Sequence, residues 1–554
     1  MNAHLRRTFY LLAMGFVALV GVLAYWQVYM RESLVNNPAN ALQSQRARET
    51  PRGLILAGDG ETVLARSERV GEESYRRVYP EGEVFANVVG YWSSRFGANG
   101  IEIGQNNNLS STDEPETLDE LINQVTGGRE AGNNVTLTLD PELQRLAHEK
   151  LANSNTGRGS VVALNPQTGE ILAMATYPSF DPNNIDEDLP ELSEDPDAPL
   201  VNRATQSLYP PGSTFKVITS AAALRAGVTP EDKFDDDGTY ETPGYTVYNY
   251  MGRDYGELTF AEALVFSVNT IFSKIAVERI GPERLAEQAF EFGFGDAYED
   301  FPLPVAPSSL GLAPEEWAKG NTAPISFGQD RVLTNVFEMA LVAGAVGNGG
   351  DLMEPRIVRE VRSPDGIILD RPTASVRNEA VPPDTAATLN DMMQRVIEDG
   401  ELVGAQIEGI EVAGKTGTAE NAAGEPHSWF VSYVPADDPE IAVAVMIENG
   451  GIIREDGSAE TPAITIAGNL MRAYLNRPAP TAEPEQPPRA PGVPGDLPGE
   501  APVQPPAQPP AQQQPFQGAP FQNPAQQQQQ FGQPPAQAPA QPPAQQAPNQ
   551  YPGG

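Results

Sequence analysis

A hydroxyl and an amine stand three residues apart where the sequence predicts the start of a helix. Ser213 and Lys216 lie in YPPGSTFKVITSAAAL, where two prolines and a glycine give way to a helical run. Side chains at positions i and i+3 of a helix share one face, so the two groups are expected to meet. A serine hydroxyl needs a base beside it to act as a nucleophile, and burial would let Lys216 serve as a neutral base. The unpaired N–H groups at the helix start would help to hold a developing oxyanion. The same spacing also fits a helix-capping serine beside a surface lysine.

Two further motifs follow in a fixed order. FSVNT lies in a predicted break between two helices and contains Ser267 and Asn269. GKTGT lies on a predicted strand and contains Lys415, Thr416, Gly417 and Thr418. Ser-x-x-Lys, Ser-x-Asn and Lys-Thr-Gly in this order form the signature set of penicillin-binding proteins and serine β-lactamases. Two of the six lysines in the chain occupy the required positions, which makes the ordered triple far more specific than any one motif.

The chain resembles the class B penicillin-binding transpeptidases, most closely the actinobacterial penicillin-binding protein A type. The segments PRGLILAGDGETVLARS, RVYPEGEVFANVVGY, GANGIE and VVALNPQTGEILAMATYPSFDPN carry this resemblance, as does ISFGQDRVLTNVFEMALVAGAVGNGG. In the last segment Asp330 stands where the family commonly has Gly, and Asn335 where Pro usually follows Thr. About a hundred residues separate the expected anchor from the catalytic region, too few for the glycosyltransferase domain of class A enzymes.

The resemblance implies a role for each catalytic residue. Ser213 would attack the D-Ala–D-Ala carbonyl of a peptidoglycan stem peptide, and Lys216 would take its proton. Ser267, beside Lys415, would relay a proton to the departing D-Ala amine. The amide of Asn269 would hold both the substrate and Lys216. No cofactor or metal is implied.

The resemblance also implies how the substrate is bound. Lys415, Thr416 and Thr418 would bind the terminal carboxylate, and the backbone N–H groups of Ser213 and Thr418 would form the oxyanion hole. Gly417 would let the substrate backbone approach the strand edge. The implied partners are stem peptides, β-lactam antibiotics and a membrane-embedded SEDS-type glycan polymerase. The acyl-enzyme would pass to an amine of a neighbouring stem and form a cross-link.

Two other functions remain open. A D,D-carboxypeptidase or β-lactamase would use water in place of the amine, and product analysis with an added acceptor would separate these reactions. A non-catalytic scaffold or β-lactam sensor is the other alternative, although the intact motifs disfavour it. Nucleic-acid binding is not expected, because a net charge of -38 repels phosphate backbones. The absence of Cys excludes disulfides and thiol catalysis.

The elements that position these residues indicate an α/β (α+β) fold. Strands are predicted at 133–140, in a hairpin around 159–178, and at 411–419, 428–435 and 440–448, with helices at 141–153 and through the middle of the chain. Strands near both ends of the region 134–476 suggest one antiparallel sheet that is flanked by helices and has a helical portion inserted. The acidic run from Asp186 to Pro199 is expected to be a solvated loop, since it lacks the spacing of a calcium-binding loop.

The ends of the chain predict its organisation and location. Residues 1–7 are expected in the cytoplasm, and residues 8–30 carry no charge and are long enough for a transmembrane helix. A cleaved signal peptide is the rival interpretation, but the stretch is long and no small-x-small site follows it. Residues 31–133 would form a small, mainly β pedestal, and 134–476 the transpeptidase domain outside the cytoplasm. Residues 477–554, rich in Pro, Gln and Ala, would be a disordered tail.

Overall fold

The protein is a mixed α/β structure, as the sequence predicts. A computed structural model describes residues 3–25, 50–71, 74–110, 131–311, 313, 317, 319–421, 424–453 and 459–476. The predicted tail, 477–554, and the last residues of the predicted anchor, 26–30, lie outside these ranges.

A five-stranded antiparallel sheet forms the centre of the catalytic region. Its strand order is β17-β18-β19-β7-β8, and every neighbouring pair is antiparallel. The strands are β7 Gly159–Leu164, β8 Ile171–Tyr177, β17 Ala413–Asn421, β18 Gly424–Val434 and β19 Ile441–Ile447. The prediction of one sheet built from both ends of the region is confirmed for the hairpin and the last three strands. The predicted strand at 133–140 does not join it and belongs to a second sheet.

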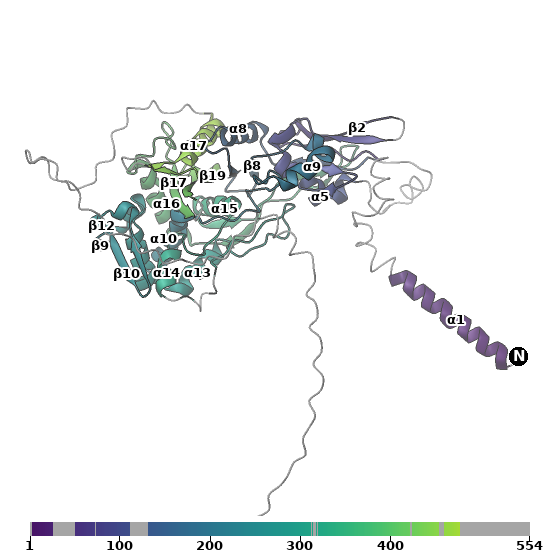
Figure 1. Cartoon of the computed structure of the whole chain (residues 1–554), viewed down its shortest axis with the longest axis horizontal. Coiled ribbons are helices and arrows are strands. Elements are labelled where there is room, and N and C mark those ends of the chain that lie inside the picture. The colour runs from purple at the N-terminus through teal and green to yellow at the C-terminus, as the bar shows by residue number, and fades with distance from the viewer. Residues whose placement is uncertain are drawn as a thin grey trace, which may run out of the picture. The chain divides into compact units, whose positions relative to one another are not determined.

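Helices cover both faces of this sheet, which explains why β7 and β19 are buried along their whole length. Val161 and Ala163 face one apolar cluster, whereas Val162 and Leu164 face another, as expected for alternating side chains. Figure 1 shows α8 and α17 on one side and α15, α16 and α10 on the other. These helices are α8 Pro141–Ala152, α10 Lys216–Arg225, α15 Val336–Gly347, α16 Pro383–Glu398 and α17 Pro462–Leu475. The predicted helix at 141–153 is confirmed, and the side chain of Asp140 caps its first backbone N–H groups.

A lobe of short helices and hairpins is inserted between β8 and β17. Its helices are α11 Phe260–Val265, α12 Asn269–Ile275, α13 Pro282–Glu291 and α14 Lys319–Ile325. Its hairpins pair β9 Lys233–Asp236 with β12 Gly256–Thr259, and β10 Thr239–Thr242 with β11 Tyr245–Tyr248. This lobe contains the second motif, in the break between α11 and α12 that the sequence predicts.

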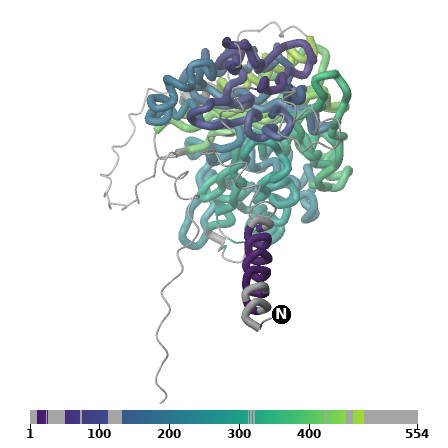
Figure 2. Tube along the Cα trace, turned by 90° about the vertical axis from the view of Figure 1, so that its right-hand side faces the viewer, coloured from purple at the N-terminus to yellow at the C-terminus, as the bar shows by residue number. Residues whose placement is uncertain are grey.

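A second sheet combines strands from both sides of residue 134. Its order is β15-β14-β6-β1-β2-β3, in which β6 is parallel to β1 and antiparallel to β14. The strands are β1 Ile55–Leu56, β2 Val63–Arg69, β3 Tyr75–Val78, β6 Asn134–Leu137, β14 Val358–Arg362 and β15 Ile368–Asp370. Figure 2 shows dark N-terminal segments beside green ones from much later in the chain. The expected pedestal is thus completed by strands of the catalytic region.

Further short helices and strands lie in the part of the chain that the structure describes. They are α4 Ala86–Val89, β4 Trp92–Ser93, β5 Gly97–Ala98, α5 Ile101–Gly104, α6 Asn106–Leu109, β13 Asp351–Met353, β16 Val376–Glu379, β20 Ile452–Ile453 and β21 Ala459–Glu460. In the N-terminal region, the buried Glu102 forms ion pairs with both Arg52 and Arg77.

The prediction of a solvated loop for the acidic run is wrong over most of its length. Residues Ile185–Glu194 form helix α9. Ile185, Leu189 and Leu192 recur at helical spacing and pack in one small apolar cluster. The three acidic residues in the first turn also interact favourably with the helix dipole.

The N-terminal segment forms helix α1, Ala3–Ala24. Within the described residues, no helix meets the length and apolarity needed to cross a membrane.

Candidate active site

Ser213 and Lys216 meet as their spacing predicts. Ser213 lies in a 3-10 turn, Gly212–Phe215, that leads directly into α10, whose first residue is Lys216. Lys216 Nζ lies 3.0 Å from Ser213 Oγ. The serine therefore precedes the α-helix by one tight turn, and the two side chains still share a face.

Close backbone packing holds this turn in place. Gly212 has φ 54°, and a Cβ there would lie 2.8 Å from the carbonyl oxygen of Thr418 on β17. Its N–H donates to the carbonyl of Gly328, 3.0 Å away. A Cβ on Gly417 would lie 2.9 Å from Pro211 O and from Thr214 Cγ2. Glycine at 212 and 417 therefore lets the serine-bearing turn and β17 touch.

The amine of Lys216 is buried among oxygens and aromatic rings. Besides Ser213 Oγ, it lies 2.6 Å from the carbonyl oxygen of Ser267, 3.1 Å from Ser267 Oγ and 2.7 Å from Asn269 Oδ1. It also lies 5.4 Å from the ring centre of Phe272 and 5.9 Å from that of Phe327. The first two motifs are therefore in direct contact through this amine.

Burial shifts the protonation of both site lysines. Desolvation, and then the positive charge of Lys415, holds the pKa of Lys216 well below its usual value of 10.5. Desolvation lowers the pKa of Lys415 to about 7. Both buried amines therefore give up a proton more readily than a lysine in an ordinary surface position.

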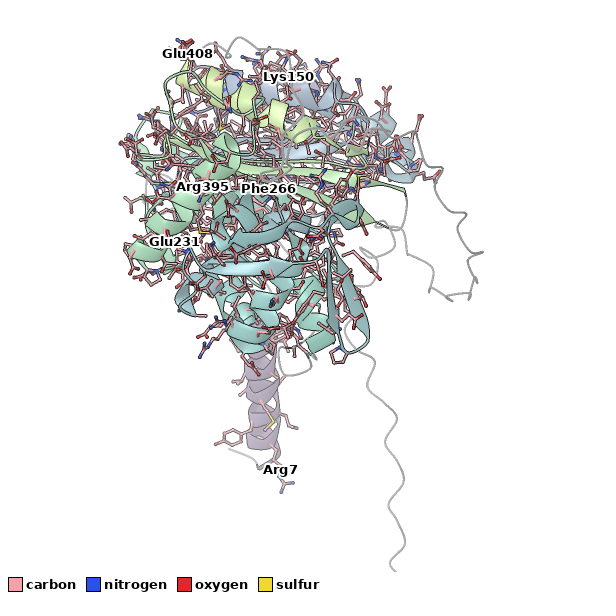
Figure 3. All side chains as sticks on the ribbon, turned by 90° about the vertical axis from the view of Figure 1, so that its left-hand side faces the viewer. Arg7, Lys150, Glu231, Phe266, Arg395 and Glu408 are labelled. Carbon is pink, nitrogen blue, oxygen red and sulfur yellow. The ribbon has the colours of Figure 1, made fainter. Side chains whose placement is uncertain are left out.

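Ser267 joins the two lysines. Its Oγ lies 3.1 Å from Lys415 Nζ and 3.1 Å from Lys216 Nζ. Its backbone has φ 58°, a left-handed conformation that is costly for a residue other than glycine. Such local strain is common at functional sites. The ring of the preceding residue, Phe266, stacks on that of Tyr255. Figure 3 labels Phe266 beside Arg395 of α16 and so marks this side of the molecule.

The third motif lies on β17, an edge strand of the main sheet, as predicted. Lys415 is fully buried, whereas Thr416 and Thr418 are half-buried. β17 pairs with β18 along one edge, and its residues contact the turn that carries Ser213. The structure also shows why a glycine is needed at position 417, which the sequence did not indicate. A side chain there would collide with the turn at Pro211–Thr214.

Several neighbours of the site were not predicted from the sequence. Phe327, Gly328 and Tyr248 are far from the motifs in sequence and reach them only through the fold. Tyr248 O accepts a hydrogen bond from Asn269 Nδ2 at 3.1 Å. Phe272, by contrast, is three residues after Asn269 on the same helix, a spacing that could have placed it on the same face.

The two departures from the family pattern have local explanations. Asp330 has φ 65°, a conformation that Gly adopts without strain and Asp tolerates better than most residues. Asn335 caps α15, since its Oδ1 accepts from the backbone N–H of Glu338 at 2.8 Å.

Comparison with known proteins agrees with this arrangement. Residues 159–472 match the model of the penicillin-binding protein transpeptidase domain, and residues 52–135 match the penicillin-binding protein A dimerisation domain. Peptidoglycan D,D-transpeptidase PbpA of Mycolicibacterium smegmatis is 35% identical over 472 residues, covering 81% of this chain and 94% of the relative.

Solved structures of penicillin-binding proteins are similar to this chain as well. The crystal structure of PBPA from Mycobacterium tuberculosis has a TM-score of 0.72 and 33% identity, covering 77% of this chain and 100% of that one. The penicillin G acyl-enzyme complex of the same protein has a TM-score of 0.70 and 34% identity, with the same coverage. The three motifs, the fold around them and these similarities lead to one conclusion: the chain belongs to the penicillin-binding transpeptidase family, and within it resembles the penicillin-binding protein A type.

Proposed function

We propose that this protein is a peptidoglycan D,D-transpeptidase that is acylated on Ser213, with Lys216 as the general base. The observation that carries the proposal is the buried Lys216 amine, 3.0 Å from Ser213 Oγ, whose pKa is lowered by desolvation. The oxygens of the Ser267 carbonyl and the Asn269 amide can only accept hydrogen bonds. A neutral amine can donate its two hydrogens to them and keep its lone pair for the serine hydroxyl.

Acylation then follows from the contacts. Ser213 Oγ attacks the carbonyl carbon of the penultimate D-Ala while its proton passes to Lys216 Nζ. The C–N bond breaks, and the departing D-Ala amine receives a proton through Ser267 Oγ, which contacts both lysines. An acceptor amine next attacks the ester, loses its proton along the same route and releases Ser213. No cofactor takes part in either step.

Substrate binding is assigned to the strand edge. The cation of Lys415 and the hydroxyls of Thr416 and Thr418 would hold the terminal carboxylate. The backbone N–H groups of Ser213 and Thr418 would stabilise the oxyanion. The short approach between Gly212 and Thr418 supports this arrangement, because it brings the two backbones together.

A β-lactam acylation experiment tests the assignment of the nucleophile. A labelled penicillin should modify Ser213 and no other residue, as found by peptide mapping of the inactivated protein. Ser213→Ala should take up no label while it melts at the same temperature as the wild type. Label on any peptide that lacks Ser213 would disprove the assignment.

Product analysis separates transfer from hydrolysis. With a stem peptide that ends in D-Ala–D-Ala and an added acceptor amine, a transpeptidase forms the cross-linked product and releases D-Ala. A D,D-carboxypeptidase or a β-lactamase gives only hydrolysed product. A scaffold or sensor takes up β-lactam but consumes no stem peptide.

The organisation of the chain is part of the proposal. Residues 8–30 would anchor it as a single-pass membrane protein with residues 1–7 in the cytoplasm. Residues 31–133 would form the pedestal, 134–476 the catalytic domain outside the cytoplasm, and 477–554 the tail. The apolar, uncharged composition of 8–30 supports the anchor. Protease protection of a tag at the N-terminus, in intact cells, tests the orientation.

A membrane-embedded SEDS-type glycan polymerase is the proposed partner. A cross-linking enzyme needs glycan strands, and the two matched domains, a transpeptidase and a dimerisation domain, do not include a polymerase. Crosslinking in membranes followed by identification of the captured protein tests this. Recovery of the transpeptidase without any such polymerase would contradict it.

A further inference from the structure

A buried carboxylate lies behind the second motif. Asp236, the last residue of β9, is 5% exposed and accepts hydrogen bonds from four groups on three parts of the lobe. Gly238 N lies 3.2 Å from Oδ1, Tyr255 N lies 2.9 Å from Oδ2, and Asn249 Nδ2 lies 2.9 and 2.8 Å from the two oxygens. The hydroxyl of Thr270 also donates to Oδ1. Burial of a carboxyl group is costly unless hydrogen-bond donors surround it, and here donors from several segments of the lobe meet both oxygens of Asp236.

Two of these partners are the sequence neighbours of groups at the active site. Asn249 follows Tyr248, and Thr270 follows Asn269. The backbone N–H of Thr270 donates to Asn249 Oδ1 at 3.1 Å, while Asn269 Nδ2 donates to the carbonyl of Tyr248 at 3.1 Å. The dipeptides 248–249 and 269–270 are therefore held together by these two hydrogen bonds and by a third contact, in which Thr270 Oγ1 lies 3.0 Å from Asn249 Oδ1. Asp236 binds one member of each dipeptide.

The orientation of the Asn269 amide depends on this pairing. Its Oδ1 accepts from Lys216 Nζ at 2.7 Å, and one Nδ2 hydrogen is taken by Tyr248 O. The second Nδ2 hydrogen remains for a substrate. Without the Tyr248 contact the amide could rotate, and Lys216 would lose a fixed acceptor.

The same hairpin also packs against the ring that covers Lys216. Val247 is buried against Ala323 and Phe327, and Phe327 lies 5.9 Å from Lys216 Nζ. Displacement of the 247–249 segment would therefore disturb the base by two routes, one polar and one apolar.

We propose that Asp236 is a positioning residue, which fastens the 248–249 segment to the start of α12 and so fixes the Asn269 amide toward Lys216 and the substrate. The inference rests on the proposed function of Ser213, Lys216 and Asn269. It adds a group that never touches the substrate.

Asp236→Asn is the first test. Asparagine keeps the shape but turns an oxygen into an NH2 group, which must face at least one donor among Asn249, Tyr255 and Thr270. The acylation rate constant for a labelled penicillin should fall about 10- to 100-fold, the effect expected when reacting groups are misplaced by less than about 1 Å. Asp235→Asn is the matched control, because it removes the same charge from an exposed position next to Asp236. It should acylate like the wild type.

A second pair of variants covers the case in which Asp236→Asn fails to fold. Thr270→Val keeps the β-branched shape but loses the hydroxyl that donates to Asp236, and should slow acylation. Thr270→Ser keeps the hydroxyl and should acylate nearly as fast as the wild type. Equal acylation by the two Thr270 variants would overturn the proposal.

A double-mutant cycle with Asn269→Ala distinguishes positioning from general support of the fold. If Asp236 acts mainly through Asn269, Asp236→Asn should slow the Asn269→Ala protein by much less than the factor of about 10- to 100-fold expected in the wild type, the remainder being the route through Phe327, while lowering the melting temperature equally in both backgrounds. Full additivity of the two effects on acylation would overturn the inference. Uptake of label by Ser213→Ala would instead overturn the proposed function. A failure of the Asp236 proposal can therefore be told apart from a failure of the proposed function.

Discussion

Replacing Lys216 by arginine or by methionine tests whether its role is to accept a proton, to supply a positive charge or only to fill space. The amine of Lys216 is fully buried between Ser213 Oγ and Asn269 Oδ1. Arginine keeps the positive charge, but a guanidinium stays protonated and cannot accept the serine proton. Methionine has a similar length and no proton to exchange. If Lys216 is the base, both variants lose the same chemical step.

The size of the effect can be worked out for each variant. General-base assistance contributes about 10²–10⁴ in rate, or about 2.7–5.5 kcal/mol of the barrier. Both variants should therefore acylate at least about 100-fold more slowly. Both variants should lose stability, for different reasons. Arginine brings additional atoms against Phe272 and Phe327 and should cost about 1–3 kcal/mol. Methionine leaves the Ser267 carbonyl and Asn269 Oδ1 without their donor and should cost about 1–3 kcal/mol as well.

The assay measures the acylation rate of each variant with a fluorescent penicillin at several pH values. Melting temperatures of the same proteins show whether each variant is folded. Lys233→Arg is the control, because that side chain is 63% exposed and lies outside the site. Acylation by either Lys216 variant within about tenfold of the wild type would refute the role of base, since that loss is below the usual range. An arginine variant that is active beside an inactive methionine variant would make Lys216 an electrostatic group instead.

Three more outcomes are expected. Because the pKa of Lys415 is about 7 in the folded protein and 10.5 is its usual value, the unfolded chain binds more protons between these limits. The free energy of unfolding should therefore rise with pH across that window by up to about 1.4 kcal/mol per pH unit, and urea titrations should show a smaller rise in Lys415→Met. Gly417→Ala places a methyl 2.9 Å from Pro211 O and Thr214 Cγ2, so it should lower stability by about 1–3 kcal/mol and slow acylation. An unchanged melting temperature and acylation rate would contradict that packing argument. Deletion of the residues after Arg477 should leave the melting temperature and the acylation rate unchanged, because the tail has no apolar periodicity. A large fall in melting temperature would show that the tail packs on the catalytic domain.

The main sheet and the active-site motifs could be predicted because their signals are local. The apolar runs that become β7 and β19 are long, and the turn between β7 and β8 is marked by Asn165-Pro166-Gln167-Thr168-Gly169. The three motifs are short patterns whose spacing reflects a helix, a break and a strand. The resemblance predicts that the three motifs lie together in space. The contacts of Lys216 and Ser267 show that they do.

Other features depend on contacts that no local pattern records. Phe327 reaches Lys216 from a loop far along the chain, and the left-handed backbone of Ser267 is imposed by its surroundings. Helix α9 was missed because the acidic run was judged only by its charges and its lack of calcium-loop spacing, while three apolar residues at helical spacing decided the structure. The pairing of β6 with β1 and β14 could not be read from strand propensity, which says nothing about partners.

The composition of the two sheets has a consequence for how the chain reaches this structure during synthesis. β7 ends at Leu164 and must wait for β19, which begins at Ile441, before its free edge is covered. β6 ends at Leu137 and waits in the same way for β14, which begins at Val358. Such a topology has a high contact order, so folding should be slow and neither region should become stable on a nascent chain that lacks the last strands. Until β19 emerges, the unpaired edge of β7 is open to other chains, and a protein that binds this edge would protect the newly made enzyme from aggregation.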